Sequence, residues 1–159
     1  MILRTASAAD IPAIMGIWNP LIRDTAVTFT TEEKTQEGLA TEIDSRGPAF
    51  IVAEEAGTVL GFASFGPFRS GPGYRHTAEH TVILADGARG RGTGRALMVR
   101  LEEAARARGI HSLIGAVSGE NAGAIAFHEA IGFARSGVLP GVGQKFDRWM
   151  DLVLFHKHV

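Results

Sequence analysis

The chain has 159 residues, of which 45% are apolar and 21% are charged, and this composition and length fit one soluble globular domain over residues 1–159. The 16 basic and 17 acidic side chains almost cancel, which argues against a general nucleic-acid-binding protein. Cysteine is absent, which excludes disulfides, thiolate nucleophiles and cysteine metal sites.

The N-terminal residues, MILRTASAAD, contain no basic segment followed by an apolar one, so we expect no secretory signal. No apolar run approaches the roughly 18 residues of a membrane span. We therefore expect no membrane segment and a cytoplasmic location.

The first half of the chain predicts two helices and a hairpin. Ser7 is a suitable N-cap with Asp10 in the first turn, and apolar residues recur at helical spacing from Ile11 to Ile22. A turn at Gly57 separates two strands. In chain order we expect a strand at 2–6, helices at 7–22 and 35–46, strands at 50–54 and 59–65, and an irregular loop at 66–74.

The second half of the chain continues this mixture of helices and strands. The helix at 94–108 has Leu97 and Leu101 inward and a Glu102/Arg106 pair outward, and Gly109 ends it. The other expected elements are strands at 77–85, 111–117, 133–142 and 148–155, and a helix at 121–131. This order predicts the α/β class, with a mixed sheet covered by helices.

A glycine- and arginine-rich loop lies between the strand at 77–85 and the helix that follows. A helix N-terminus has unpaired N–H groups, and glycines let a phosphate approach them closely. The glycine spacing fits neither a dinucleotide fingerprint nor a P-loop, and a basic turn that binds nothing is the alternative. The candidate phosphate-binding residues are Arg89, Gly90, Arg91, Gly92, Thr93, Gly94 and Arg95.

Two motifs in this half carry a resemblance to a known family. Arg89-x-x-Gly92-x-Gly94 resembles the Q/R-x-x-G-x-G/A signature of the GNAT acetyltransferases. The segment at 121–133 is similar to that family's N-x-x-A-x-x-x-Y-x-x-x-G-F, except that His128 stands at the Tyr position. A histidine there resembles the branch of phosphinothricin and methionine sulfone or sulfoximine N-acetyltransferases, and the segments at 63–66, 74–82 and 142–152 are also similar to that branch.

The resemblance implies the GNAT fold, with a mixed, mostly antiparallel sheet of about seven strands and four helices. It implies acetyl-CoA as co-substrate, no metal, and a homodimer. The loop at 89–94 is then expected to hold the CoA pyrophosphate, and Asn121 to contact the cofactor. The backbone groups expected to pair with the pantetheine arm and the acetyl carbonyl are those of Val82, Ile83 and Leu84.

Acetyl transfer to a small-molecule amine requires groups that move protons. In the branch that the chain resembles, the residues at Glu79 and His128 are catalytic. We assign Glu79 as general base, directly or through water, and His128 as a second base or as the acid that protonates the CoA sulfur. A solvated glutamate and a core histidine are the alternatives.

An acidic group on the amine substrate would need a cationic partner. Arg69 and Arg75 flank the irregular loop ahead of Glu79, and a guanidinium can pair with a carboxylate or phosphinate through two hydrogen bonds. Two exposed loop arginines are the alternative interpretation. Phe29 is a candidate for the pocket wall, and Lys145 and Arg148 are further candidates without an assigned role.

Three other functions remain as alternatives. Residues 76–80 match the H-x-x-E-H pattern of inverted zinc peptidases, but that pattern needs a helix. On a strand its two histidines would lie about 13 Å apart, too far for one zinc ion. A non-catalytic acyl-CoA-binding module and an enzyme that acetylates a protein N-terminus or lysine are the other two.

Overall fold

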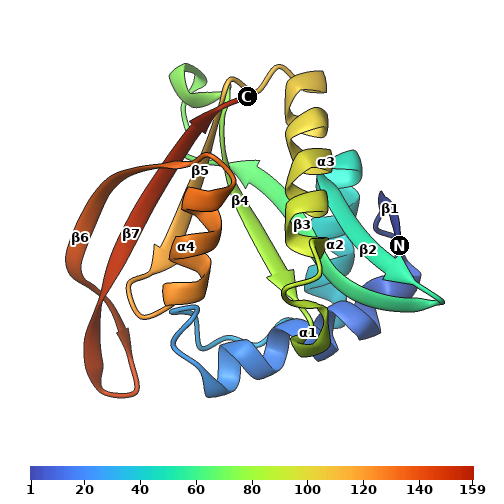
Figure 1. Cartoon of the computed structure of the whole chain (residues 1–159), viewed down its shortest axis with the longest axis horizontal. Helices are drawn as coiled ribbons and strands as arrows, with labels where there is room; N and C mark the ends of the chain where they lie inside the picture. The colour runs from blue at the N-terminus through green and yellow to red at the C-terminus, as the bar shows by residue number, and fades with distance from the viewer.

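The computed structural model describes residues 1–159 and confirms the predicted order of helices and strands (Figure 1). The last two strands extend further than the sequence suggests. In the first of these two strands Gly and Pro residues interrupt the pattern, and the register shift between Leu139 and Gly143 absorbs them. The elements are β1 (Ile2–Thr5), α1 (Ile11–Asp24), α2 (Gln36–Arg46), β2 (Phe50–Glu55), β3 (Thr58–Pro67), β4 (Thr77–Leu84), α3 (Thr93–Ala107), β5 (Ser112–Ser118), α4 (Ala122–Ala130), β6 (Ala134–Lys145) and β7 (Arg148–His158).

The strands form one seven-stranded sheet in the order β1-β2-β3-β4-β5-β7-β6. All neighbours are antiparallel except β4 and β5, which are parallel. These two strands pair only from Thr77 with Ser112 to His80 with Gly115. Beyond that point they separate, and Figure 1 shows the resulting V between them.

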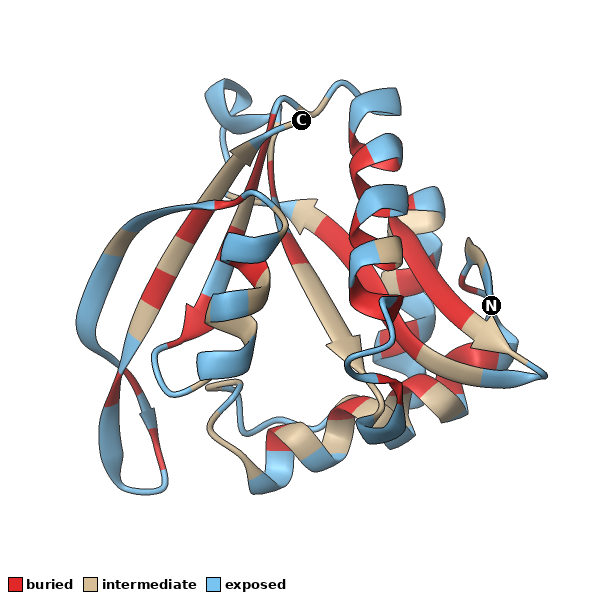
Figure 2. Ribbon diagram, viewed as in Figure 1, coloured by how far each residue is buried: buried red, intermediate tan, exposed pale blue.

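Helices cover both faces of this sheet, as the sequence predicts (Figure 1). The core on the α3 face includes Phe65, Leu101 and Phe155, and the core on the α1 and α2 face includes Trp18 and Phe62. The buried residues lie along the inner sides of the helices and on the central strands (Figure 2). No helix has the length and apolar character needed to cross a membrane.

The start of α1 is fixed by a network of charged side chains. Ser7 and Asp10 form a capping box around a short 3-10 turn, as the first-turn acid suggests. Arg4 of β1 donates to Asp10 at 2.7 and 2.8 Å and to Glu54 of β2 at 2.7 and 2.9 Å. The network therefore anchors α1 to the edge of the sheet.

One surface prediction is wrong in part. Arg106 donates to Glu102 at 3.4 Å, as the helical spacing predicts, but Glu102 is buried and only 7% exposed instead of facing outward. Lys157 of β7 donates to the Glu102 carboxylate at 2.7 Å and to the carbonyl of Ile131 at 3.1 Å. A partner 55 residues away in the chain therefore covers a residue that local spacing assigns to the solvent.

Candidate functional site

A cavity of about 760 Å³ occupies the V between β4 and β5. Residues 81–84 and 116–118, the parts of the two strands that no longer pair with each other, line it. The edge of β4 that faces β5 therefore has backbone N–H and C=O groups without a strand partner. Such an edge can pair with an extended ligand in the way that a neighbouring strand would.

The glycine-rich loop lies at the mouth of this V. Gly90 and Gly92 adopt positive φ angles of 72° and 82°, which glycine accepts readily, and α3 begins at Thr93 without a side-chain cap. The first N–H groups of a 15-residue helix therefore remain available at the cavity. The loop residues that line the cavity are Arg89, Gly90, Gly92, Thr93, Gly94 and Arg95.

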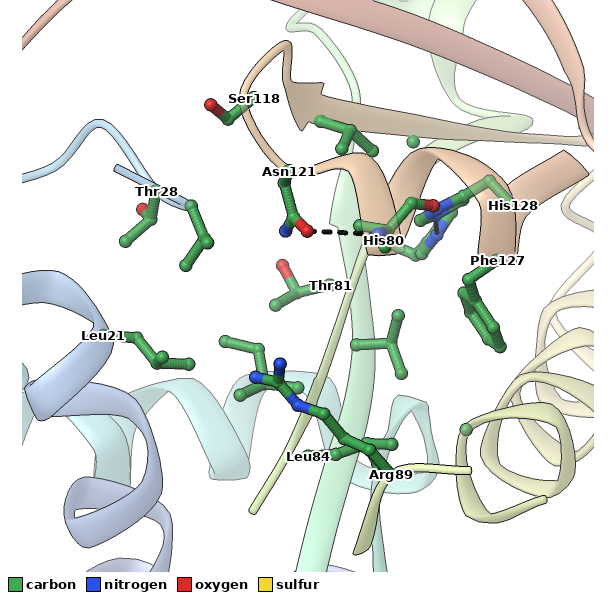
Figure 3. Close-up of a pocket in the computed structure, with 18 of the residues that line it drawn as sticks. Leu21, Thr28, His80, Thr81, Leu84, Arg89, Ser118, Asn121, Phe127 and His128 are labelled. Atoms are coloured by element: carbon green, nitrogen blue, oxygen red, sulfur yellow. Dashed lines mark hydrogen bonds between the residues drawn. The ribbon is translucent and has the colours of Figure 1, made fainter. Parts of the chain in front are cut away.

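Two arginines of this loop differ in their environment. Arg89 lines the cavity, and Figure 3 shows its side chain reaching into it. Arg91 does not line the cavity, because it donates to Glu55 at 2.8 Å on the outside of the loop. The structure therefore provides Arg89, but not Arg91, as a charge inside the cavity.

Asn121 lines the opposite wall, beside Ser118 (Figure 3). Its Oδ1 accepts from the N–H of Ala124 at 3.1 Å and caps α4. The Nδ2 group donates to no protein atom, so it is free to donate to a ligand.

His128 of α4 and His80 of β4 form a buried pair at the point where the strands separate. Their Nε2 atoms lie 2.9 Å apart, and Nδ1 of His128 lies 2.7 Å from the carbonyl oxygen of Ala124. Both residues line the cavity and are buried, with 4% of His128 and 6% of His80 exposed. Burial lowers the pKa of both imidazoles, and the neighbouring His128 lowers the pKa of His80 further.

Glu79 lies on the other face of β4 from His80, because side chains alternate along a strand. It does not line the cavity and makes no hydrogen bond to His128. Partial burial raises the pKa of the Glu79 carboxyl group above its ordinary value. The structure therefore does not bring Glu79 and His128 together, although Thr81 on the same face as Glu79 does line the cavity.

The predicted arginine clamp is not assembled at the cavity. Arg69 lies over the ring of Tyr74, 5.5 Å from its centroid, and Arg75 donates to His76 at 3.0 Å. Both are exposed and neither lines the cavity. Arg148 pairs with Glu120 at the surface.

The segment 27–29 closes the cavity on the side of α1, and Phe29 lines it as the sequence suggests. The β6 strand holds this segment. The buried Lys145 donates to the carbonyl of Thr28 at 2.8 Å. The ring of Phe29 lies so close to Gly143 that a Cβ atom there would be 2.4 Å from it.

Sequence reasoning missed His80 and the apolar wall of Trp18, Leu21 and Leu152. The signal for His80 was the strand alternation that places Ala78, His80 and Val82 on one face, toward the cavity-lining helix α4. His76 lies in a turn and residues 77–80 at the start of β4, not on a helix, so the peptidase pattern lacks its geometry. No group of three or more His, Asp or Glu side chains is arranged to hold a metal ion.

The comparisons with known proteins agree with one another. Residues 18–133 match the family described as the acetyltransferase (GNAT) family. An L-methionine sulfoximine/L-methionine sulfone acetyltransferase of Pseudomonas aeruginosa is 38% identical over 94% of this chain and 90% of its own length. A phosphinothricin N-acetyltransferase of Alcaligenes faecalis is 31% identical over 98% of this chain and 81% of its own.

Solved structures give the same result. The yncA protein of Salmonella typhimurium, solved with its cofactor acetyl-CoA, superposes with a TM-score of 0.94 at 35% identity, covering 99% of this chain and 93% of that one. A ribosomal-protein-alanine N-acetyltransferase of Brucella melitensis superposes with a TM-score of 0.94 at 40% identity, and each chain is covered completely.

The packing of Phe29 on Gly143 leads to a testable prediction. Gly143→Ala should displace the Phe29 ring and lower the free energy of unfolding by about 1–3 kcal/mol, because the new methyl group has no room. Gly137→Ala on the same strand is the matched control, since nothing lies within 4 Å of its Cβ position. Urea denaturation measures both changes. Equal stability of the two variants would contradict the proposed packing of the cavity wall.

Proposed function

The chain belongs to the acetyltransferase (GNAT) family, and on that premise we propose that it transfers the acetyl group of acetyl-CoA to the primary amine of a small amino-acid-like substrate. The substrate is of the methionine sulfone, methionine sulfoximine or phosphinothricin type, as in the relatives named for those compounds. The observation that carries the proposal is the cavity in the V, with a helix N-terminus at its mouth and a free strand edge along it.

Acetyl-CoA fits the chemistry of this cavity. The pyrophosphate would lie on the N–H groups at the start of α3, near Arg89 and Arg95. The amides of the pantetheine arm would pair with the free edge of β4 at Val82, Ile83 and Leu84, and Asn121 would donate from the opposite wall. The thioester then reaches the point where β4 and β5 meet.

The acceptor amine is proposed to enter from the α1 side, where Trp18, Leu21, Phe29 and Leu152 form an apolar wall. Its nitrogen attacks the thioester carbon, a C–N bond forms, the C–S bond breaks, and CoA leaves as thiolate. The amine proton goes to Glu79. Glu79 does not line the cavity, whereas Thr81, about 7 Å further along the strand, does. One water is therefore expected to carry the proton from the amine to Glu79.

His128 also lines the cavity, and whether it can transfer a proton depends on its contacts with His80 and Ala124. The role of Arg69 and Arg75 as a clamp for an acidic group stays a prediction, because both side chains have partners outside the cavity. The cytoplasmic location expected from the sequence also stays a prediction.

We also propose that the chain forms a homodimer through the hairpin of β6 and β7. This hairpin exposes a set of large apolar side chains, with Trp149 68% exposed. Monomeric proteins rarely expose a contiguous apolar patch without a function for it. The exposed large apolar residues on the hairpin are Val138, Leu139, Val142, Phe146 and Trp149.

The first test is release of CoA from acetyl-CoA with a panel of amines: methionine sulfone, methionine sulfoximine, phosphinothricin, ordinary amino acids and an alanine-starting peptide. We expect turnover with the first three compounds. Glu79→Gln should lower kcat/KM about a hundredfold or more, because the general base is lost. Glu103→Gln, an exposed glutamate of α3, is the matched control and should leave the rate unchanged.

The pH profile refines this test. Glu79 acts in its charged form and its pKa is raised, so kcat/KM should fall with decreasing pH at a pH above the ordinary glutamate value, and this limb should vanish in Glu79→Gln. Turnover with the peptide alone would support the protein acetylation suggested by the Brucella melitensis structure instead. CoA binding without turnover of any amine would favour a non-catalytic module.

The pyrophosphate site makes a separate prediction. Arg89→Ala should weaken CoA binding about tenfold, because a charge inside the cavity is lost. Arg91→Ala should weaken it by less than about twofold, because Arg91 pairs with Glu55. Calorimetric titration with CoA measures both, and an equal loss in the two variants would overturn the assignment.

The proposed dimer is tested by molar mass. Light scattering of the purified protein should give twice 16.9 kDa, and Trp149→Ala combined with Val142→Asp should give the monomer mass, because a charge then replaces an apolar contact. Val99→Asp is the matched control, because Val99 is also an exposed apolar residue but lies on α3, away from the hairpin. A wild-type protein with the mass of one chain would refute the dimer.

A further inference from the structure

The buried side chains of His80 and His128 are held by specific contacts of their ring nitrogens as well as by packing. Four ring nitrogens are present, and their partners are known for three of them. Nδ1 of His128 lies 2.7 Å from the carbonyl oxygen of Ala124, and the two Nε2 atoms lie 2.9 Å apart. Nδ1 of His80 is buried and has no hydrogen-bond partner.

These contacts fix the positions of the ring protons. A carbonyl oxygen only accepts, so Nδ1 of His128 carries a proton and donates it to Ala124. Burial keeps both rings neutral, so Nε2 of His128 has a lone pair and Nε2 of His80 must donate to it. The remaining nitrogen, Nδ1 of His80, is then a bare acceptor, which accounts for its missing partner. The opposite tautomer of His128 would place two lone pairs 2.7 Å apart.

No charged side chain acts on the pKa of either ring; besides burial, His128 lowers the pKa of His80 and the backbone of Ile114 raises it. The ring of Phe155 stacks on His128, and the ring of Phe133 lies tilted against His80 and edge-on to His128, with centroids 5.0–5.4 Å away. Two cations of the neighbouring strands lie over these phenyl rings, Lys157 over Phe133 and Arg135 over Phe155.

The β5 side of the pair presents only backbone. A Cβ atom at Gly115 would lie 3.0 Å from His80 and 3.1 Å from His128, so the absence of a side chain there lets the rings meet.

We propose that His80 is a positioning residue for His128: by donating its Nε2 proton, it holds His128 as a neutral Nδ1–H tautomer at the point where β4 and β5 separate. Both nitrogens of His128 are then occupied within the protein. In the resting enzyme His128 offers the cavity neither a free lone pair nor a spare proton. One consequence of this inference rests on the proposed function: the amine proton goes to Glu79 and not to His128.

The test uses the full chain and does not depend on turnover. Nitrogen-15 NMR of the imidazole rings at pH 7 should show His80 as the Nε2–H tautomer and His128 as the Nδ1–H tautomer, both neutral. An imidazolium or an Nε2–H tautomer at His128 would overturn the proposal. If NMR shows the expected tautomers but no amine is acetylated, the histidine pairing is confirmed and only the proposed function is contradicted.

Two variants at His80 separate positioning from packing. His80→Gln retains an amide N–H near the position of Nε2, so the His128 signals should keep the Nδ1–H pattern. His80→Leu removes the donor and keeps the apolar bulk. The proton affinity of His128 should then rise about tenfold, because a hydrogen bond to its neutral form is lost. The acid limb of the pH–rate profile should gain a second titration in His80→Leu and not in His80→Gln.

Identical His128 titrations in His80→Leu and the wild type would refute the positioning role. If His80→Leu does not fold, the wild-type tautomers and the His80→Gln spectrum decide the proposal by themselves.

Discussion

The short pairing of β4 with β5 is the constraint on which the rest of the site depends. It is the one parallel contact in the sheet, and it ends after His80 and Gly115. A parallel pair needs a crossover, which α3 supplies here. Because α3 follows the carboxyl end of β4, its N-terminus and the glycine-rich loop lie at the open mouth of the V. The separation of the two strands and the proposed phosphate site at the start of α3 therefore both follow from the β4–α3–β5 crossover.

The same strand divides the chemistry between its two faces. His80 and Val82 face α4, while Glu79 and Thr81 face α1 and α2. A ligand along the free edge of β4 runs between these faces. The arrangement separates a neutral, apolar histidine pair from a glutamate in contact with solvent, and burial acts on them in opposite directions: it lowers the pKa of the histidines and raises that of Glu79.

Local sequence predicts those parts of the site whose function depends on local backbone. The loop at 89–94 and the start of α4 at Asn121 lie where the sequence places them, because glycine conformation and helix ends are set by neighbouring residues. Arg91 and Glu102 depart from expectation because their partners, Glu55 and Lys157, are distant in the chain. His80 was overlooked for the same reason: its importance comes from His128, which lies 48 residues away.

The acceptor side depends most on long-range packing, and the β6–β7 hairpin provides it. Gly143 and Lys145 are buried and hold Phe29 and Thr28, while the alternating residues Val142 and Phe146 are exposed. The exposed and buried side chains of β6 alternate along one backbone. A contact that fixes the exposed side chains therefore also fixes the buried ones that hold the cavity wall. The proposed dimer and the amine pocket are thus coupled through a few residues of β6.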